Sequence, residues 1–339
     1  MVRAMYGVMF LGIFLGVTSF SGRVLAGEDR SDDRVYQYVV KSAEGEFDAI
    51  SAALETTAET AGWQVLSQTD AGVPDGCSYR ARVLVLYDAA YAAALMEANR
   101  TTGPFAAVDR INLFEDENGT HVSLVNPVCI NRTVLMDDEA YRTLSENHLQ
   151  KLRTMITGAV DGTVSERAYG QERKKGRIGK TMGVMAGGDF IDKLEDELVV
   201  ADGNLEEVAA NVRRGLSETG AEWGMELAYE VSLPDYQTVI FGATGTPMDS
   251  KSFDIVKAGS DKSRKPFSCP GLAHAPAYPL EIVVTQEEDG IKVRIINAMF
   301  RMKMYFEDAG MWAFMKNMGM PGSIQDELRG QITKYISGS

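Results

Sequence analysis

The sequence predicts an α+β protein made of two similar α/β-sandwich-like repeats, and three observations support this prediction. The chain has 339 residues, about twice the usual size of one domain. Segments with the periodicity of strands and helices follow one another in the same order in both halves. Asn126 and Asn297, each of which follows an acidic hairpin turn, lie 171 positions apart, as do the turns themselves. This agreement indicates an internal duplication.

The N-terminus has the pattern of a secretory signal. Arg3 precedes an apolar run that ends near Phe20, and small residues before position 27 predict cleavage after Ala26. An uncleaved membrane anchor is the alternative, but the run contains three glycines and is short for a full span. We therefore expect residues 1–26 to be a signal peptide and residues 27–34 to be mobile. The mature protein would be exported, most simply to a bacterial periplasm, without membrane association.

The first repeat, residues 35–157, opens with alternating residues that predict a strand. Phe47, Ile50 and Leu54 then recur at helical spacing, and Gly62 is placed to end that helix. Asn118-Gly119 readily adopts the positive backbone angles of a tight turn and predicts a hairpin. The expected order is strand 35–40, helix 47–61, strands 63–66 and 81–87, helix 89–98, hairpin 111–125, a short segment after Asn126 that resembles the methionine-rich one below, and helix 137–156.

The second repeat, residues 193–336, gives the same order and ends in a methionine-rich stretch. Seven of the seventeen methionines lie between residues 297 and 320. The expected elements are a helix from 205 to about 220, strands 226–231 and 238–242, hairpin 280–296, a methionine-rich strand at 297–306, and a final helix that runs to about residue 336.

Residues 158–192 join the repeats and predict a linker, because they are rich in glycine and carry a basic cluster at residues 173–177. Residues 179–181 resemble the end of a phosphate-binding loop, but Lys174 stands where that motif needs glycine. The whole chain has 48 acidic and 34 basic residues and a formal charge of −14. Such a charge repels phosphate backbones, so nucleic acid is not an expected partner.

The three cysteines, Cys77, Cys129 and Cys269, would enter an oxidising compartment in which disulfides persist. They allow three single pairings and always leave one thiol over. A bond between Cys77 and Cys129, within one repeat, needs the fewest assumptions. Cys269 would then be free, buried or a metal ligand.

The first repeat resembles the family called domain of unknown function 302. The resemblance lies in Gly62-Trp63, the buried strand at 83–87 with Asp88-Ala89, the hairpin turn at 114–119, and Asn126-Pro127. It covers residues 35–157 and, more loosely, 193–336, where Ala298 replaces the proline. The resemblance implies a small α+β unit that tends to pair, so a tandem copy would form an intramolecular pseudo-dimer. The family has no established reaction and therefore implies no catalytic positions.

The methionines of the second repeat are the main chemical candidates. Thioether sulfurs suit Cu(I), and copper is a plausible cargo of an exported protein. Aromatic residues are interleaved with the methionines, however, which is typical of a core or of an adaptable binding surface. The candidate copper ligands are Met299, Met302, Met304, Met311, Met315 and Met318, with Cys269 and His274 from a proline-rich loop.

Other chemistry has weaker support in the sequence. His274 can also be interpreted as a residue of a surface loop without a ligand role. His121 can be interpreted as an exposed residue of a hairpin strand. Serine hydrolase chemistry lacks its Gly-x-Ser-x-Gly signal. The leading interpretation is a non-enzymatic exported binding protein with a methionine-rich hydrophobic surface on the second repeat for a small ligand or an exported protein partner. A periplasmic copper-binding or copper-delivery protein is the alternative, and an enzyme of unidentified reaction comes third.

Overall fold

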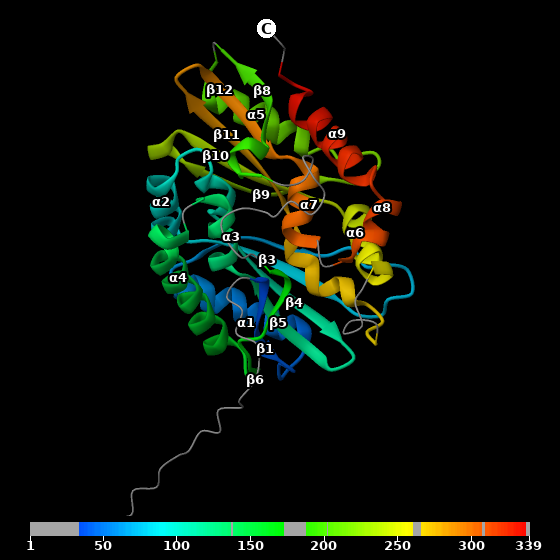
Figure 1. The fold of residues 1–339 in the computed structure, drawn as a ribbon. Helices are drawn as coiled ribbons and strands as arrows, with labels where there is room; N and C mark the ends of the chain where they lie inside the picture. The colour runs from blue at the N-terminus through cyan, green and yellow to red at the C-terminus, as the bar shows by residue number, and fades with distance from the viewer. Residues whose placement is uncertain are drawn as a thin grey trace, which may run out of the picture.

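The computed structural model describes residues 34–136, 138–172, 188–201, 203–259, 266–306 and 309–336. The expected signal peptide, nearly all of the expected mobile segment and the basic cluster at 173–177 lie outside these ranges. The described chain is a mixed α/β structure with two antiparallel sheets (Figure 1). Within the described ranges, no helix combines the length and the apolar character that a bilayer crossing requires.

The first sheet has seven strands in the order β2-β3-β4-β5-β1-β6, and β7 also pairs with β1. The hairpin predicted at Asn118-Gly119 is confirmed, because β4 and β5 pair on either side of it. Two strands come from the region expected to be a linker and extend the sheet beside β1. The strands are β1 (Arg34–Lys41), β2 (Gln64–Asp70), β3 (Ala81–Tyr87), β4 (Asp109–Asp116), β5 (Gly119–Val125), β6 (Thr163–Val164) and β7 (Ala168–Glu172).

The second sheet has five strands in the order β8-β12-β11-β10-β9. Its central hairpin turns at Gly290, as predicted. The strands are β8 (Leu194–Val200), β9 (Glu226–Leu233), β10 (Thr238–Thr244), β11 (Leu280–Glu287) and β12 (Gly290–Ile296).

Helices cover both sheets. The helices that begin at Phe47, Ala89, Asp138 and Leu205 start at or next to the residue that the sequence predicts. Asp88 and Asn204 cap two of them by accepting hydrogen bonds from backbone amides of the first turn. The α-helices are α1 (Phe47–Thr60), α2 (Ala89–Ala98), α3 (Pro127–Val134), α4 (Asp138–Ala159), α5 (Leu205–Leu216), α6 (Thr246–Gly259), α7 (Ala298–Phe306), α8 (Met311–Lys316) and α9 (Met320–Thr333). The short 3-10 helices are η1 (Gly103–Ala106), η3 (Ile191–Lys193), η4 (Pro234–Tyr236) and η5 (Pro270–Ala277).

The segments that follow the two hairpins are helices, so the prediction of a methionine-rich strand is wrong. Asn126 accepts a hydrogen bond from the amide of Val128 and begins α3, and Asn297 accepts one from the amide of Phe300 and begins α7. The single predicted final helix is also wrong, because it is divided into α8 and α9. Pro321 lies in the first turn of α9, a position that proline favours because its missing N–H has no helical partner there.

One hydrophobic core belongs to the first half, and a larger one is shared by both halves. Leu84 and Ile111 point from the first sheet toward α1 and α4, where they pack with Leu54. The alternate residues, such as Val83 and Val85, face the other way and join a cluster that also contains the second sheet. Because successive strand residues point to opposite faces, the first sheet separates these cores.

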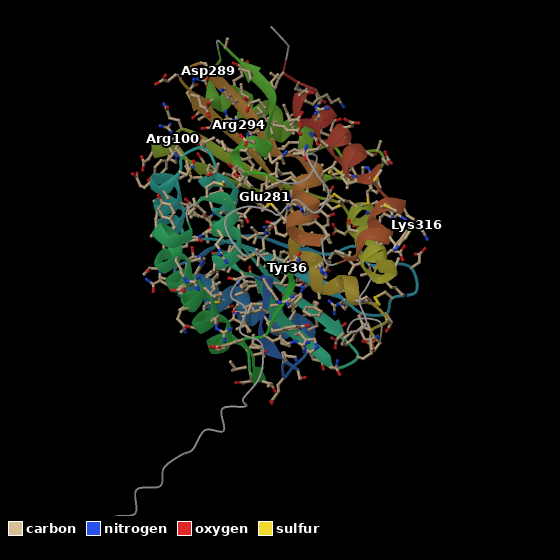
Figure 2. All side chains as sticks on the ribbon, in the orientation of Figure 1. Tyr36, Arg100, Glu281, Asp289, Arg294 and Lys316 are labelled. Carbon is tan, nitrogen blue, oxygen red and sulfur yellow. A yellow bond between two sulfur atoms is a disulfide. The ribbon has the colours of Figure 1, made fainter. Side chains whose placement is uncertain are left out.

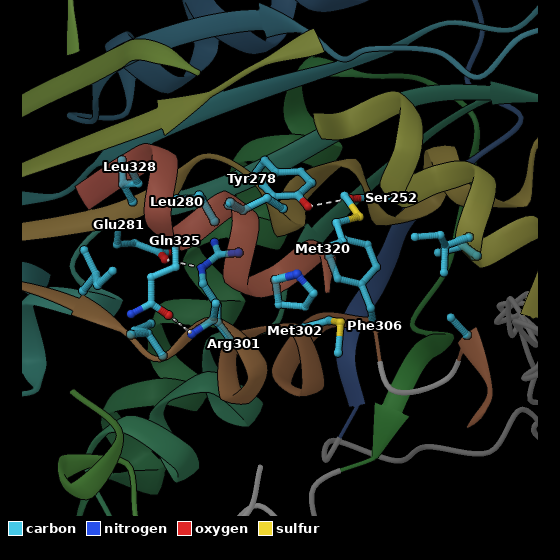
Figure 3. A pocket seen from close by; sticks show the side chains of 18 residues that line it. Ser252, Tyr278, Leu280, Glu281, Arg301, Met302, Phe306, Met320, Gln325 and Leu328 are labelled. Carbon is cyan, nitrogen blue, oxygen red and sulfur yellow. Dashed lines mark hydrogen bonds and ion pairs between the residues drawn. The ribbon is translucent and has the colours of Figure 1, made fainter. Parts of the chain in front are cut away.

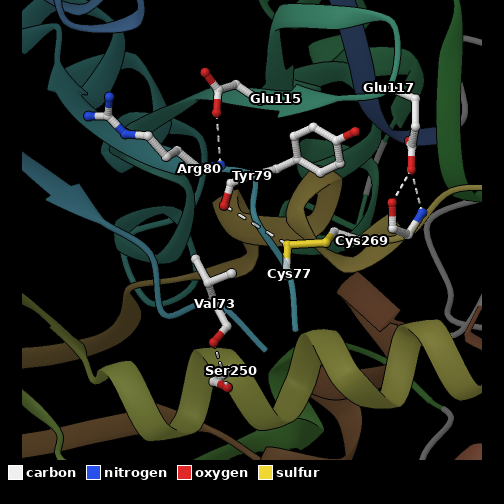
Figure 4. The surroundings of a disulfide bond; sticks show 9 residues. Val73, Cys77, Tyr79, Arg80, Glu115, Glu117, Ser250 and Cys269 are labelled. Atoms are coloured by element: carbon white, nitrogen blue, oxygen red, sulfur yellow. Dashed lines mark hydrogen bonds between the residues drawn. A yellow bond between two sulfur atoms is a disulfide. The ribbon is translucent and has the colours of Figure 1, made fainter. Parts of the chain in front are cut away.

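A disulfide between Cys77 and Cys269 joins the two halves, with a Cα–Cα distance of 5.8 Å (Figure 4). The predicted bond between Cys77 and Cys129 is therefore wrong. Cys129 lies on α3 and is buried in the shared core. Cys77 lies in the loop between β2 and β3, which lies over the second half. There Ser250 donates a hydrogen bond to the carbonyl of Val73 (3.1 Å).

Candidate ligand pocket

A mainly apolar pocket lies in the second half, between the sheet and three helices (Figure 3). It contains about 80 Å³ of space that the centre of a water molecule could occupy, enough for several waters or a small organic group. Its lining comes from β11, β12, α6, α7 and α9 and their flanking loops. The residues are Ser252, Ile255, Val256, Tyr278, Leu280, Glu281, Ile295, Ile296, Ala298, Arg301, Met302, Phe306, Ala309, Met320, Pro321, Ile324, Gln325 and Leu328.

Helical periodicity explains why the walls are apolar. On α7, Ala298, Met302 and Phe306 recur every four residues and share one face. On α9, Met320, Ile324 and Leu328 repeat that spacing. Two of the seven clustered methionines therefore line the pocket, where their flexible thioether side chains can adapt to an occupant.

A few polar side chains lie on the pocket wall. The hydroxyls of Ser252 and Tyr278 form a 2.6 Å hydrogen bond with each other. The amide oxygen of Gln325 accepts a hydrogen bond from the backbone N–H of Ala298 at 3.3 Å. Burial raises the pKa of Tyr278 above its ordinary value, so this hydroxyl is neutral at physiological pH.

At the polar end, a buried carboxylate lies between two buried arginines. Oε1 of Glu281 is 2.7 Å from Nη1 of Arg110, and its Oε2 is 2.8 Å from Nε of Arg301. Glu281 lies near the middle of the molecule, between the two halves (Figure 2). Burial alone would raise the pKa of Glu281, but the positive charges of Arg301 and Arg110 outweigh burial and hold it below its ordinary value. Glu281 is therefore ionised at neutral pH.

Carbonyl oxygens and a tyrosine accept further hydrogen bonds from the two arginines. Both guanidinium groups donate to the carbonyl oxygens of Ala277 and Pro279. Nη2 of Arg110 also donates to the hydroxyl of Tyr305, 2.5 Å away. Burial raises the pKa of Tyr305, so its hydroxyl carries no charge at neutral pH. The cluster thus contains two positive charges and one negative charge.

The structure does not gather all the predicted methionine ligands into one place. Met304 is only 2% exposed and packs in the shared core, whereas Met315 and Met318 are 44% and 49% exposed. Met299 and Met302 are half-buried on α7. The side chain of Met311 lies outside the described part of the structure.

The two other candidate copper ligands also differ from expectation. The sulfur of Cys269 is bonded to Cys77, and it cannot bind a metal as a thiolate while that disulfide persists. His274 is fully buried and stacks on Phe306, with 5.7 Å between ring centroids, so the surface-loop interpretation is wrong. In the described ranges, no three His, Cys, Asp or Glu side chains are grouped so as to hold a metal ion. Copper binding through methionine sulfurs stays a prediction.

His121 is buried as well, in contrast to the exposed position expected for it. Its Nε2 lies 2.9 Å from Asp116, and its Nδ1 accepts a hydrogen bond from the amide of Ser42 at 3.1 Å. These contacts tie the hairpin to the end of β1, which makes His121 a structural residue of the first half.

Sequence reasoning missed the buried charges Arg110, Glu281 and Arg301. One signal was present: Arg110 and Glu281 each interrupt an apolar strand one residue after its start. A second signal was their separation, which is the same 171 positions that relate Asn126 to Asn297.

No family model matches the chain, and a search of curated proteins finds no match. Among solved structures, the chain is similar to an uncharacterized conserved protein DUF302 from Bacillus stearothermophilus, with 15% sequence identity and a TM-score of 0.32. That similarity covers 37% of this chain and 98% of the other.

Proposed function

We propose that the protein is a non-enzymatic exported binding protein that holds a small, mainly apolar ligand in the pocket of its second half. The observation that carries the proposal is the lining of that pocket: two methionines and many aliphatic side chains surround a few convergent polar groups. This composition is typical of small-molecule sites. The polar groups are engaged with one another, as in the pair of Ser252 and Tyr278, which favours recognition of a ligand over chemistry on it.

We also propose that the two halves arose by duplication and form an intramolecular pseudo-dimer. Contacts between them are reciprocal: η5 packs on β4 of the first half, and η1, which also precedes a hairpin, packs on β11 of the second. The edge strands β2 and β9 contact each other as well. Arg110 and Glu281, at equivalent positions by the 171-residue offset, pair directly, as residues close to a two-fold axis do.

The binding proposal is tested with an apolar fluorescent probe, 1-N-phenylnaphthylamine. The native protein should enhance its fluorescence saturably. Met302→Trp fills the pocket with a larger side chain and should weaken binding at least tenfold. Met315→Trp introduces the same side chain at an exposed methionine on α8 and should bind like the native protein.

Urea unfolding of both variants provides the folding control, because added bulk in a packed site typically costs about 1–3 kcal/mol. Absence of probe binding to the native protein would overturn the proposal. If both tryptophan variants lost probe affinity equally, the probe would bind at a surface other than this pocket.

A further inference from the structure

The buried cluster of Arg110, Glu281 and Arg301 has one more positive charge than negative charge. The carboxylate of Glu281 is shared between Arg110 and Arg301, and both arginine side chains are almost fully buried. Tyr229, Tyr278 and Tyr305, the other titratable groups around them, have pKa values raised by burial and are neutral. The excess of one positive charge is therefore enclosed in protein, where water stabilises it poorly and an anion would be favoured.

The hydrogen bonds of Arg301 leave part of this positive charge available to the pocket. Its Nε donates to Glu281, and its Nη2 donates to the carbonyl oxygens of Ala277 and Pro279. No described residue accepts a hydrogen bond from the remaining nitrogen, Nη1. Arg301 lines the pocket and Arg110 does not, so Arg301 is the guanidinium that an occupant can reach. The close-up shows it on the same wall as Glu281 and Gln325 (Figure 3).

The rest of the cavity suits a hydrocarbon chain. From Arg301 the walls continue as Met302, Phe306, Ile324 and Leu328, with the paired hydroxyls of Ser252 and Tyr278 as the other polar feature. A ligand with one anionic end and an apolar body would match both parts of the surface. Charge-assisted hydrogen bonds from arginine to a carboxylate are stronger than neutral ones and favour such an end group.

We propose that the pocket binds an aliphatic monocarboxylate, with its carboxylate on Nη1 of Arg301 and the carbons next to the carboxylate among the methionine and aliphatic side chains. This inference rests on the proposed function, because it specifies the ligand class of the same pocket. It also assigns Arg301 the role of determining the charge of the ligand.

The test compares three ligands with the same ten-carbon chain, each below its critical micelle concentration: decanoate, decanol and decyltrimethylammonium. Displacement of 1-N-phenylnaphthylamine from the native protein by each ligand is measured at pH 7.5, and titration calorimetry checks the affinities. We expect decanoate to bind about tenfold or more tightly than decanol, because its head group gains a charged hydrogen bond. The ammonium compound should bind most weakly.

Two lysine substitutions then locate the effect. Arg301→Lys keeps the positive charge beside Glu281 but removes the free nitrogen, and it should reduce the preference for decanoate over decanol about tenfold. Arg329→Lys makes the same change at a half-exposed arginine of α9 that pairs with Glu197 and does not line the pocket, and it should leave the preference unchanged. If neither variant folds, the ligand comparison on the native protein still decides the question.

The two proposals can fail separately. If none of the three compounds binds and the probe does not bind, the binding function itself is wrong. If decanol binds as tightly as decanoate, or the ammonium compound binds most tightly, the apolar site stands and the anionic ligand class is overturned.

Discussion

Asp249 is a buried carboxylate of the second half. It lies in the first turn of α6 and accepts hydrogen bonds from the amide of Gly72 (3.1 Å) and the hydroxyl of Thr244 (3.3 Å). The chain approaches so closely here that a Cβ on Gly72 would lie 2.1 Å from the carbonyl oxygen of Thr246. Burial raises the pKa of Asp249 to about 7, although both hydrogen bonds oppose that shift.

This residue should make stability depend on pH. A carboxyl whose pKa is higher in the folded than in the unfolded state favours folding while it is protonated, so its contribution is lost as pH rises from about 4 to about 7. Asp249→Asn keeps an acceptor for Gly72 without the charge. We expect the variant to be more stable than the native protein at pH 8, by about 4 kcal/mol at most, and to lose this advantage at pH 4.

Urea unfolding of native and variant protein at several pH values provides the measurement. A matched control is Asp235→Asn on η4, an exposed carboxylate that should change little. If the stability of Asp249→Asn depended on pH in the same way as that of the native protein, ionisation of Asp249 would not destabilise the fold.

At the scale of residues, only one of the six methionines predicted as ligands, Met302, lines the pocket, and the charges at its polar end were not predicted. A methionine cluster is visible in the sequence because methionine is rare. Arg301 lies in the segment that the sequence predicted as a strand, and only the fold shows that its side chain is buried against Glu281.

At the scale of elements, predictions succeeded where local chemistry decides the conformation. The hairpin turns at Asn118-Gly119 and Gly290 are examples, since glycine adopts the required backbone angles wherever the chain lies. The segments after Asn126 and Asn297 were misjudged because each helix is short and apolar on most sides. Asn126-Pro127 is nevertheless a recognisable start of a helix, with a capping side chain followed by proline.

The disulfide is an element-scale tether between the β2–β3 loop and the start of η5. It spans 192 residues, and closing so long a loop in the unfolded chain implies up to about 5 kcal/mol of stabilisation in the chain-entropy model. We expect the Cys77→Ser, Cys269→Ser double variant to unfold at a lower urea concentration than the native protein. Alkylation in denaturant without reductant should modify one thiol of the native chain, and three after reduction.

A reducing agent supplies the control for that experiment. It should lower the stability of the native protein to that of the double variant and leave the double variant unchanged. An equal effect on both proteins would point to Cys129, the buried third cysteine, as the source of the change.

At the scale of the molecule, the shared core determines how the chain unfolds. Val83 and Val85 of the first sheet belong to the same cluster as Phe241 and Ile282 of the second, so neither half can lose its packing without exposing the other. Each fully buried side chain of this size contributes roughly 1.5–3 kcal/mol. The sequence predicted two units but not the extent of their contact, because non-local packing leaves no periodic signal in either half.

We therefore expect both halves to unfold in one transition. Two variants that each retain one tryptophan, Trp63 in the first half or Trp223 in the second, allow the halves to be followed separately by fluorescence. Their urea midpoints should coincide with each other and with the midpoint from circular dichroism. Two separated transitions would show that the halves are independent folding units.

The position of the disulfide also bears on the order in which the chain is synthesised. Cys129 follows Cys77 closely, whereas Cys269 is made 192 residues after Cys77. The first thiol available to Cys77 during synthesis is therefore that of Cys129, and the native bond can form only after about half of the second half has been made. Burial of Cys129 in α3 removes that competitor once the first half has begun to pack. The bond thus requires that the chain has been made at least as far as Cys269, in the middle of the second half.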